Sequence, residues 1–257
     1  MRYALTVLGL LLVVGGAVAQ DRTASGTPTL GFDRYRNAVV HVGKSPKGAN
    51  LVDDKPIWLG TGFVLDGECT FVTAKHVLAS VGETDMVVVR FQLPQERSRV
   101  ITRQVEVLRK EQNTDLAFLK IRTISDQACT SGNLNALSLL SSVGGIGALG
   151  GERVLIIGHP SVADKDVDVP VVRGGIIASA EMNWLGSDRL YPMLLLDLTG
   201  VPGFSGSPVI LEGTGMVVGV VYGPGPTPRT AGFEWATPLT LEDYTRAVAQ
   251  SPVDSKK

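Results

Sequence analysis

A succession of short apolar or alternating runs, separated by turn residues, limits the possible folds of this chain more than any other feature. The runs begin at Ala38 and recur almost to the end of the sequence. Many short strands with regular turn signals are typical of all-β sandwiches and barrels. The expected strands are Trp58–Leu65, Thr70–Thr73, Met86–Phe91, Val105–Leu108, Leu116–Ile121, Arg153–Gly158, Val171–Ala178, Met193–Asp197, Pro208–Leu211, Met216–Tyr222 and Phe233–Ala236.

A glycine-rich segment divides these runs into two sets. It covers residues 141–152 and separates the run that ends at Ile121 from the one that begins at Arg153. The chain has 257 residues, which is compatible with one large all-β unit or with two small lobes that share a cleft. Since 44% of the residues are hydrophobic, a sizeable core can be buried. We therefore place a lobe boundary in the glycine-rich segment.

One serine lies in a turn that suits a nucleophile. Ser205 stands between Gly203 and Gly206, just before the apolar run Val209–Leu211. Glycine adopts backbone conformations that let N–H groups turn inward, and an oxyanion hole requires such fixed backbone donors. We interpret Ser205 as a nucleophile and the N–H groups of Gly203 and Ser205 as the oxyanion hole. The alternative is a glycine-rich hairpin turn with an incidental serine.

A serine nucleophile needs a base, usually a histidine held by a carboxylate. The chain has three histidines. His41 lies within a strand-like run and is expected to be structural, while His159 follows a strand as a loop residue. His76 lies where a β-branched run ends and a short helical turn begins, which places an imidazole at the rim of a barrel. Asp115 precedes an apolar run and supplies the carboxylate, so the predicted catalytic residues are His76, Asp115 and Ser205.

The chain order of these three residues resembles that of the trypsin/chymotrypsin-like serine peptidases. The local sequences are closest to the bacterial HtrA (Deg) branch and its relatives without a PDZ domain. Phe204 and Ser207 depart from the commoner Gly-Asn/Asp-Ser-Gly-Gly motif, but neither position supplies the nucleophile or a required side-chain donor. The resemblance covers about Ala38 to Val248, and its matching segments are Gly60–Val64, Thr73–Val77, Thr114–Ala117, Arg173–Ile177, Gly203–Pro208 and Trp235–Pro238.

The resemblance implies an all-β fold of two six-stranded antiparallel β-barrels with a short C-terminal helix packed against the second barrel. It places the N-terminal barrel in 35–140, the inter-barrel linker in 141–152, the C-terminal barrel with the helix in 153–250 and a tail in 251–257. Thr240 is the expected N-cap of the helix, and Leu241, Tyr244 and Val248 fall on one helical face.

The function that the resemblance implies is that of a serine endopeptidase acting through an acyl-enzyme intermediate. The alternative is a binding module on a protease fold that has lost catalysis. The α/β-hydrolase esterases are excluded, because their histidine follows the serine and no histidine follows Ser205 here.

The resemblance also places a substrate pocket beside the nucleophile. Its floor falls at Thr199, and its wall continues through Tyr222 and Gly223. Thr199 is neutral, and Asp197 lies two residues too early to form the floor. The sequence therefore predicts a small or apolar residue before the cleaved bond, and not Lys or Arg.

The first 19 residues have the pattern of a secretory signal peptide. Arg2 is followed by the apolar run Ala4–Val14, and Ala17–Ala19 fits the small-x-small cleavage pattern. The alternative is an uncleaved membrane anchor, but the apolar run is short for a span of about 20 residues. We expect residues 1–19 to be removed, 20–34 to form a flexible leader, and the mature protein to be periplasmic or extracellular, without a stable membrane anchor.

Export makes the cysteines informative, because disulfides persist in oxidising compartments. Cys69 and Cys129 are the only two, one before the strand that leads to His76 and the other after the strand that follows Asp115. We expect a disulfide between them; the alternative is two free buried thiols.

The charge of the chain is nearly balanced, with 24 Lys and Arg against 25 Asp and Glu. Removal of Met1–Ala19 takes away Arg2 and leaves a net charge of about −2. This balance does not favour nucleic acid or an anionic membrane as a partner. The sequence contains no metal-ligand cluster, so we expect no cofactor and a protein or peptide substrate. The oligomeric state stays open.

Overall fold

The computed structural model describes residues 35–65, 69–92, 100–121, 137–138, 149–162, 165–166, 169–185, 190–224 and 232–249. The predicted signal peptide 1–19, leader 20–34 and tail 251–257 lie outside the described residues, and so does most of the linker 141–152.

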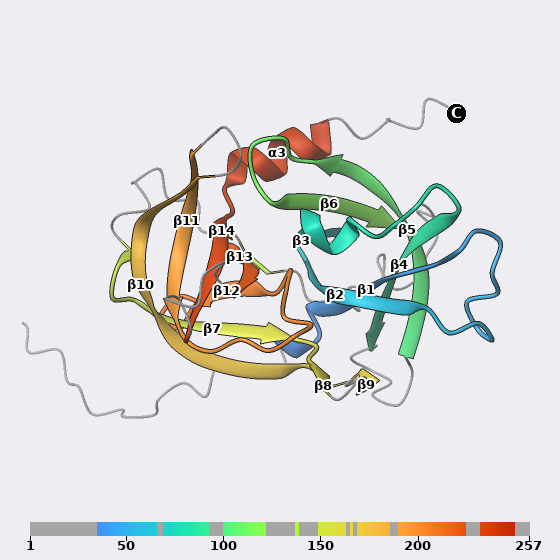
Figure 1. The fold of residues 1–257 in the computed structure, drawn as a ribbon, viewed down its shortest axis with the longest axis horizontal. Coiled ribbons are helices and arrows are strands. Elements are labelled where there is room, and N and C mark those ends of the chain that lie inside the picture. The colour runs from blue at the N-terminus through green and yellow to red at the C-terminus, as the bar shows by residue number, and fades with distance from the viewer. Residues whose placement is uncertain are drawn as a thin grey trace, which may run out of the picture.

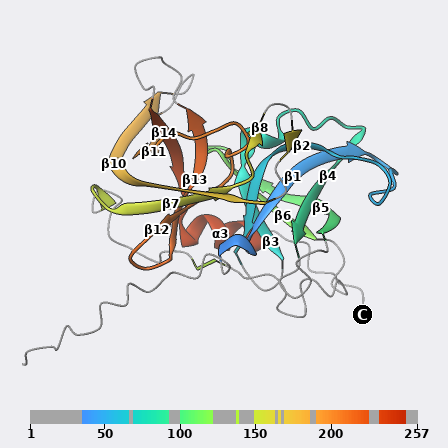
Figure 2. The ribbon, with the colours of Figure 1, turned by 90° about the horizontal axis from the view of Figure 1, so that it is seen from below.

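Two closed antiparallel β-barrels lie side by side (Figures 1 and 2). In the first barrel the strands neighbour one another in the order β1-β2-β3-β6-β5-β4. A short 3₁₀ helix, η1 (Lys75–Leu78), directly follows β3. The strands are β1 (Val39–Pro46), β2 (Ile57–Val64), β3 (Thr70–Ala74), β4 (Asp85–Gln92), β5 (Val100–Lys110) and β6 (Leu116–Ile121).

The second barrel has the strand order β10-β11-β14-β13-β12-β7. A separate two-stranded sheet, β8 (Ser161–Val162) with β9 (Lys165–Asp166), follows β7. The barrel strands are β7 (Arg153–Gly158), β10 (Val171–Leu185), β11 (Leu190–Asp197), β12 (Pro208–Leu211), β13 (Val217–Pro224) and β14 (Phe233–Pro238).

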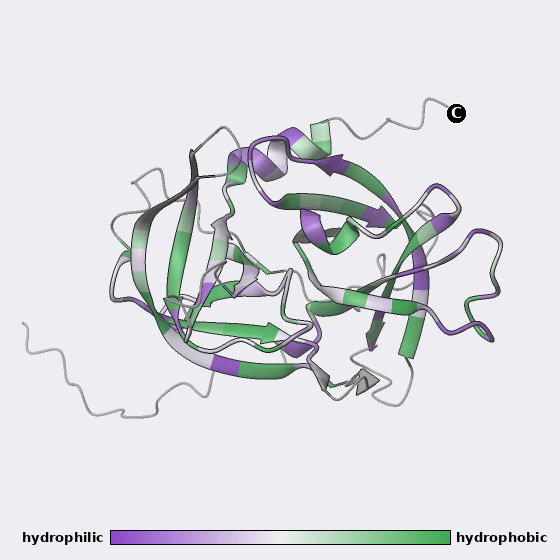
Figure 3. Cartoon of the chain, in the orientation of Figure 1, coloured by the Kyte–Doolittle hydropathy of each residue, from purple (hydrophilic) through white to green (hydrophobic). Residues whose placement is uncertain are grey.

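Apolar side chains hold the barrels closed and join them to each other. Strands β6, β7 and β11 are predominantly hydrophobic along their length (Figure 3). Phe63, Phe71 and Phe118 are fully buried in the first barrel. The core cluster of that barrel continues into the second one through Ile157, Ile210, Val217 and Val220. Burial of apolar surface therefore fixes the two barrels against each other as well as closing each of them.

The predicted fold class is confirmed: the chain forms two six-stranded antiparallel barrels with a short C-terminal helix. Each run expected to be a strand is a strand, although β5 and β10 extend well beyond their predicted bounds. The small β8–β9 sheet was not expected. The strands of the first barrel span Val39–Ile121 and those of the second span Arg153–Pro238, while the domain bounds themselves stay predictions.

The C-terminal helix α3 (Leu241–Ala249) packs differently from the expectation. It follows the last strand of the second barrel, but its buried Ala247 and half-buried Tyr244 join the core cluster of the first barrel. Arg246 Nη1 lies 3.5 Å from Glu111 Oε2, next to β5. Leu241 is 50% exposed and does not belong to the buried face. The expected docking on the second barrel is wrong, because α3 contacts β5 of the first barrel.

Cys69 leads into β3 as a buried residue with φ of 59°. It is disulfide-bonded. Cys129 lies outside the described residues, so the pairing of these two cysteines stays a prediction.

As predicted, Thr240 caps the N-terminus of α3. Its Oγ1 accepts a hydrogen bond from Asp243 N at 3.1 Å, and its own N–H donates to Asp243 Oδ2 at 3.1 Å. These bonds satisfy backbone donors that have no partner within the helix.

Thr240→Ala should lower the free energy of unfolding by about 1 kcal/mol, because the N-cap acceptor is lost. Urea denaturation of the variant and the wild type measures this difference. Thr245→Ala is the matched control: Thr245 lies exposed on the same helix and its hydroxyl donates to Leu241 O. An equal loss in both variants would show that capping is not the cause.

Candidate active site

His76 and Asp115 lie together at the end of the first barrel. The imidazole Nδ1 is 2.6 Å from Asp115 Oδ2, and the backbone N–H of His76 donates to Asp115 Oδ1 at 2.9 Å. Both carboxylate oxygens are therefore engaged by one residue. The Asp115 side chain is only 15% exposed, while that of His76 is 37% exposed. The ring is thus held from the protein side and open to solvent on the other.

Local structure explains why these two residues meet. His76 lies in η1, directly after β3, and Asp115 immediately precedes β6, which pairs with β3. Lys75 adds three hydrogen bonds to the segment before β6: its N–H donates to Asp115 O, and its Nζ donates to Glu111 O and Thr114 O, both at 2.8 Å. Lys75 therefore fixes the turn that carries the carboxylate.

Two glycines with positive φ shape the turn around Ser205. Gly203 has φ of 93° and Gly206 has φ of 89°. A side chain at Gly203 would overlap the carbonyl of His159, and one at Gly206 would overlap the carbonyl of Thr61. Both positions need glycine for conformation and for space.

The N–H groups of this turn divide into paired and available donors. Phe204 N donates to Val201 O at 3.1 Å and Gly206 N donates to Val221 O at 2.8 Å. Among the described residues, the N–H groups of Gly203 and Ser205 donate to no acceptor. The turn therefore carries two available donors, at the positions that the sequence predicted.

The peptide before Gly203 is oriented by the segment that follows β7. Pro202 O accepts a hydrogen bond from Ser161 N at 2.8 Å. Because C=O and N–H point in opposite directions across a trans peptide, this bond directs the Gly203 N–H away from Ser161.

Thr61 of β2 connects the first barrel to the turn around Ser205 in the second barrel, which is called the nucleophile turn below after the predicted role of Ser205. Its N–H donates to Ser205 O at 2.9 Å, and its Oγ1 donates to Gly203 O at 2.7 Å. The same hydroxyl accepts from His159 N at 3.0 Å, and Thr61 O accepts from Thr73 Oγ1 at 2.6 Å. Thr61 is fully buried, so one residue sets the distance between the turn and the barrel that carries His76.

Ser205 and His76 come from different barrels and meet around Tyr222. Ser205 Oγ donates to Tyr222 O at 3.1 Å, and the Tyr222 ring lies 4.9 Å from the His76 ring. Burial, and then the negative charge of Asp115, raise the pKa of the Tyr222 hydroxyl. Among the described residues, no hydrogen bond joins Ser205 Oγ to His76.

Two of the three predicted pocket residues lie next to Ser205. A side-chain carbon at Gly223 would lie 3.6 Å from Ser205 Oγ, so the backbone of this glycine borders the Ser205 hydroxyl. Tyr222 is half-buried against His76, whereas Thr199 is exposed. The structure thus brings Gly223 and Tyr222 to Ser205, and their roles in binding substrate stay a prediction.

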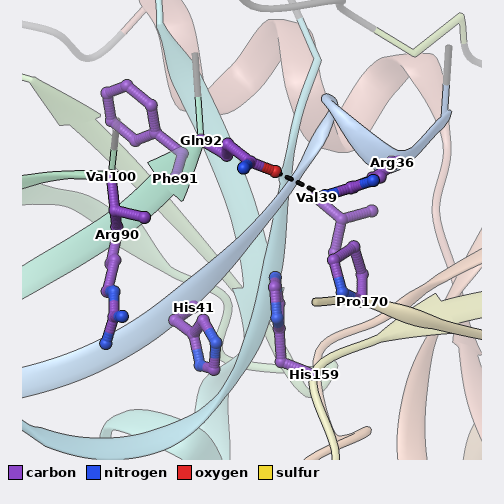
Figure 4. Close-up of a pocket in the computed structure, with 9 residues that line it drawn as sticks. All are labelled: Arg36, Val39, His41, Arg90, Phe91, Gln92, Val100, His159 and Pro170. Atoms are coloured by element: carbon purple, nitrogen blue, oxygen red, sulfur yellow. Dashed lines mark hydrogen bonds between the residues drawn. The ribbon is translucent and has the colours of Figure 1, made fainter. Parts of the chain in front are cut away.

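The other two histidines lie together at the junction of the barrels (Figure 4). His41 of β1 stacks on His159 at 3.6 Å between ring centroids, and both residues are buried. They line a cavity of about 20 Å³ together with Arg36, whose Nη2 donates to Gln92 Oε1 at 2.6 Å. A volume of this size holds one water molecule. The backbone of His159 lies against Thr61 and Gly203: its N–H donates to Thr61 Oγ1 at 3.0 Å, and its carbonyl occupies the space that a side chain at Gly203 would take.

One acidic residue near the turn was missed by sequence reasoning. Glu234 of β14 is 4% exposed, and its Oε1 accepts a hydrogen bond from Gly200 N at 2.9 Å. Burial raises the pKa of this carboxyl, and the bond from Gly200 opposes the rise. A charged residue between Phe233 and Trp235 in a buried strand was the only available signal.

No group of three or more His, Cys, Asp or Glu in the described part of the chain could hold a metal ion.

The sequence matches a known protein family. The family model of the trypsin-like peptidase domain matches residues 60–220, more than half of the chain. No curated protein matches the chain.

Solved structures with the same fold include the HtrA-type protease AlgW, Deg5 and the MamO protease domain. The HtrA-type protease AlgW with a decapeptide has a TM-score of 0.62 and 20% identity, over 85% of this chain and 66% of its own. Deg5 has a TM-score of 0.59 and 18% identity, over 84% and 89%. The MamO protease domain from Magnetospirillum magneticum has a TM-score of 0.58 and 18% identity, over 84% and 97%. The chain thus spans slightly less than two thirds of the AlgW chain, and identities this low show a shared fold.

Thr61→Val should lower the free energy of unfolding by about 1–3 kcal/mol, because His159 N and Gly203 O lose their hydrogen-bond partner in the interior. Denaturant unfolding measures the loss. Thr61→Ser keeps the hydroxyl and should retain most of the stability. If Thr61→Val and Thr61→Ser lower the free energy of unfolding equally, the change in side-chain shape or volume is responsible for the loss and the hydroxyl group is not.

Glu234→Gln should stabilise the protein relative to the wild type by an amount that grows with pH. The folded protein raises the pKa of Glu234 above the ordinary value of 4.5, so folding favours the protonated form. The wild type therefore loses stability as the pH rises from below 4.5 through the folded-state pKa, while glutamine does not titrate.

Unfolding of both proteins at pH 4 and pH 8 measures this trend. Glu152→Gln, at an exposed site, is the control and should give a difference that is the same at both pH values. A gap between Glu234→Gln and the wild type that narrows as the pH rises would contradict the prediction.

Proposed function

The chain belongs to the trypsin-like peptidase family, and we propose that it is an exported serine endopeptidase whose catalytic residues are His76, Asp115 and Ser205. The observation that carries this proposal is the double contact of Asp115 with His76, through Nδ1 and the backbone N–H. Such a carboxylate fixes both the position and the protonation of the imidazole.

The tautomer of His76 follows from its partner. An ionised carboxylate only accepts hydrogen bonds, so the proton of the neutral ring resides on Nδ1. The lone pair of Nε2 is then available to take the proton of Ser205 Oγ during attack on a peptide carbonyl. After attack, the imidazolium is stabilised by Asp115 and returns its proton to the leaving amine, which leaves an acyl-enzyme on Ser205. Water hydrolyses this ester by the same proton transfers.

The negative charge of the tetrahedral intermediate needs donors that are already in place. The N–H groups of Gly203 and Ser205 are the candidates. The bond from Ser161 N to Pro202 O supports this assignment, since it directs the Gly203 N–H away from the protein segment behind the turn. Phe204 is 1% exposed within the core of the second barrel and anchors the turn.

One observation favours the second candidate, a binding module without catalysis. Ser205 Oγ bonds to Tyr222 O in place of His76. Catalysis requires a rotation about the Ser205 Cα–Cβ bond that brings Oγ to the imidazole. Catalytic hydrogen bonds are often long or misaligned before substrate is present, so we favour the peptidase.

Export and the disulfide belong to the same proposal. The signal pattern of residues 1–19 supports a periplasmic or extracellular location, and the disulfide-bonded state of Cys69 fits an oxidising compartment. Within the described residues, no helix has the length and apolar character needed to span a bilayer. We propose a protein or peptide substrate and no cofactor.

Ser205→Ala should reduce kcat for a peptide substrate by about 10⁶, because the nucleophile is removed. Asp115→Asn should reduce it by about 10⁴, because the amide favours the wrong imidazole tautomer. Cleavage of a mixed peptide library by the wild type identifies a substrate, and its kcat in the variants checks both values.

A serine-directed fluorophosphonate separates the two candidate functions. An active enzyme reacts with it at Ser205 alone, and Ser205→Ala abolishes the labelling. A folded wild-type protein that neither reacts with the probe nor cleaves any peptide would be the binding module.

A further inference from the structure

Glu234 brings a buried negative group to the loop that precedes the nucleophile turn. A side chain at Gly200 would overlap the Glu234 carboxyl group. The carboxyl group thus occupies the space that a side chain at position 200 would take. Among the described residues, Oε2 of Glu234 accepts no hydrogen bond and no cationic side chain forms an ion pair with the group.

The strand that carries Glu234 lies between the two segments that border Ser205. Strand β14 pairs with β11 on one side, where Glu234 is opposite Leu196. It pairs with β13 on the other side, where Glu234 is opposite Pro224. The chain runs from β11 through Thr199 and Gly200 into the nucleophile turn, and Pro224 follows the glycine that borders Ser205 Oγ. Glu234 therefore lies between the two segments that carry the predicted pocket residues, and its carboxyl group lies against the first of them, at Gly200.

We propose that Glu234 determines the primary specificity of this site by pairing with a cationic side chain, Lys or Arg, of the residue before the cleaved bond. This inference rests on the proposed function and names the substrate class of the same site. It replaces the expectation from Thr199: that residue is neutral and exposed, and the charge of the pocket comes instead from a strand that follows Ser205 in the sequence.

The chemistry of the carboxyl group favours a cation as its ligand. An ionised carboxylate buried without a counter-charge is unfavourable, and a hydrogen-bonded cation compensates it. Gly200 N uses Oε1, which leaves Oε2 to accept from an ammonium or guanidinium. A substrate with a neutral side chain leaves this oxygen without a partner.

Paired peptide substrates that differ only in charge test the proposal. One peptide carries arginine before the cleaved bond and the other carries citrulline, its neutral isostere. The wild type should cleave the arginine peptide with a kcat/KM about 10- to 100-fold higher, the range expected for a charge-assisted hydrogen bond. In Glu234→Gln this ratio should fall to about 1. Asp197→Asn removes a nearby exposed carboxylate, and should retain the wild-type ratio.

A binding measurement keeps the inference testable without turnover. Benzamidine is a cation at neutral pH, and benzamide is its neutral analogue. Benzamidine should raise the Tm of the wild type and compete with the fluorophosphonate for Ser205, whereas benzamide at the same concentration should do neither. This comparison uses only the wild-type protein, so it tests the cation site even if Glu234→Gln fails to fold.

The possible results distinguish a failure of the cation site from a failure of the proposed function. In one result, the wild type reacts with the fluorophosphonate and yet cleaves the arginine and citrulline peptides with equal kcat/KM. This result would retain the proposed function and overturn the role of Glu234. Loss of the ratio in Asp197→Asn also overturns it, because a general negative field is then responsible. A wild type that does not react with the probe loses the proposed function, and its response to benzamidine against benzamide then decides whether the cation site exists.

Discussion

The hydrogen bonds of Thr61 are the constraint on which the rest of this site depends. The proposed base and its carboxylate partner belong to the first barrel and the proposed nucleophile belongs to the second, so the proposed reaction requires a fixed relation between two separately closed sheets. Thr61 supplies that relation through its bonds to Ser205 O, Gly203 O and His159 N. Because it is fully buried, its bonds lie in an environment of low dielectric, where an unpaired partner is costly. Displacement of the turn therefore requires several buried bonds to break together.

Close packing reinforces the same junction. A side chain at Gly60 would come within 2.8 Å of Ser205 O. A side chain at Gly206 would overlap Thr61 O, and one at Gly158 would come within 3.2 Å of Thr61 Oγ1. Glycines of both barrels thus let backbone approach backbone at the interface. The stacked rings of His41, in β1, and His159, directly after β7, add a side-chain contact between the barrels.

The two largely buried carboxylates at the site, Asp115 and Glu234, differ in how many hydrogen bonds they accept. Asp115 is largely buried but uses both oxygens on His76, which stabilises a carboxylate that has left water. Glu234 is buried more deeply and has a single described hydrogen bond. Two carboxylates thus differ in how completely the protein satisfies them. The incompletely satisfied one has a lone pair available for a substrate, which is the physical reason to assign it to recognition.

The sequence by itself determined the two sets of strands, the chain order of His76, Asp115 and Ser205, and the helical turn at His76, because these depend on local periodicity, glycine positions and residue chemistry. The N-cap at Thr240 was predictable for the same reason. Only the tertiary structure decided that α3 packs on the first barrel, that Thr61 connects the barrels, and that Glu234 reaches Gly200. Each of these contacts joins residues far apart in the sequence, and their pairing follows from the closure of the barrels, which no local pattern encodes.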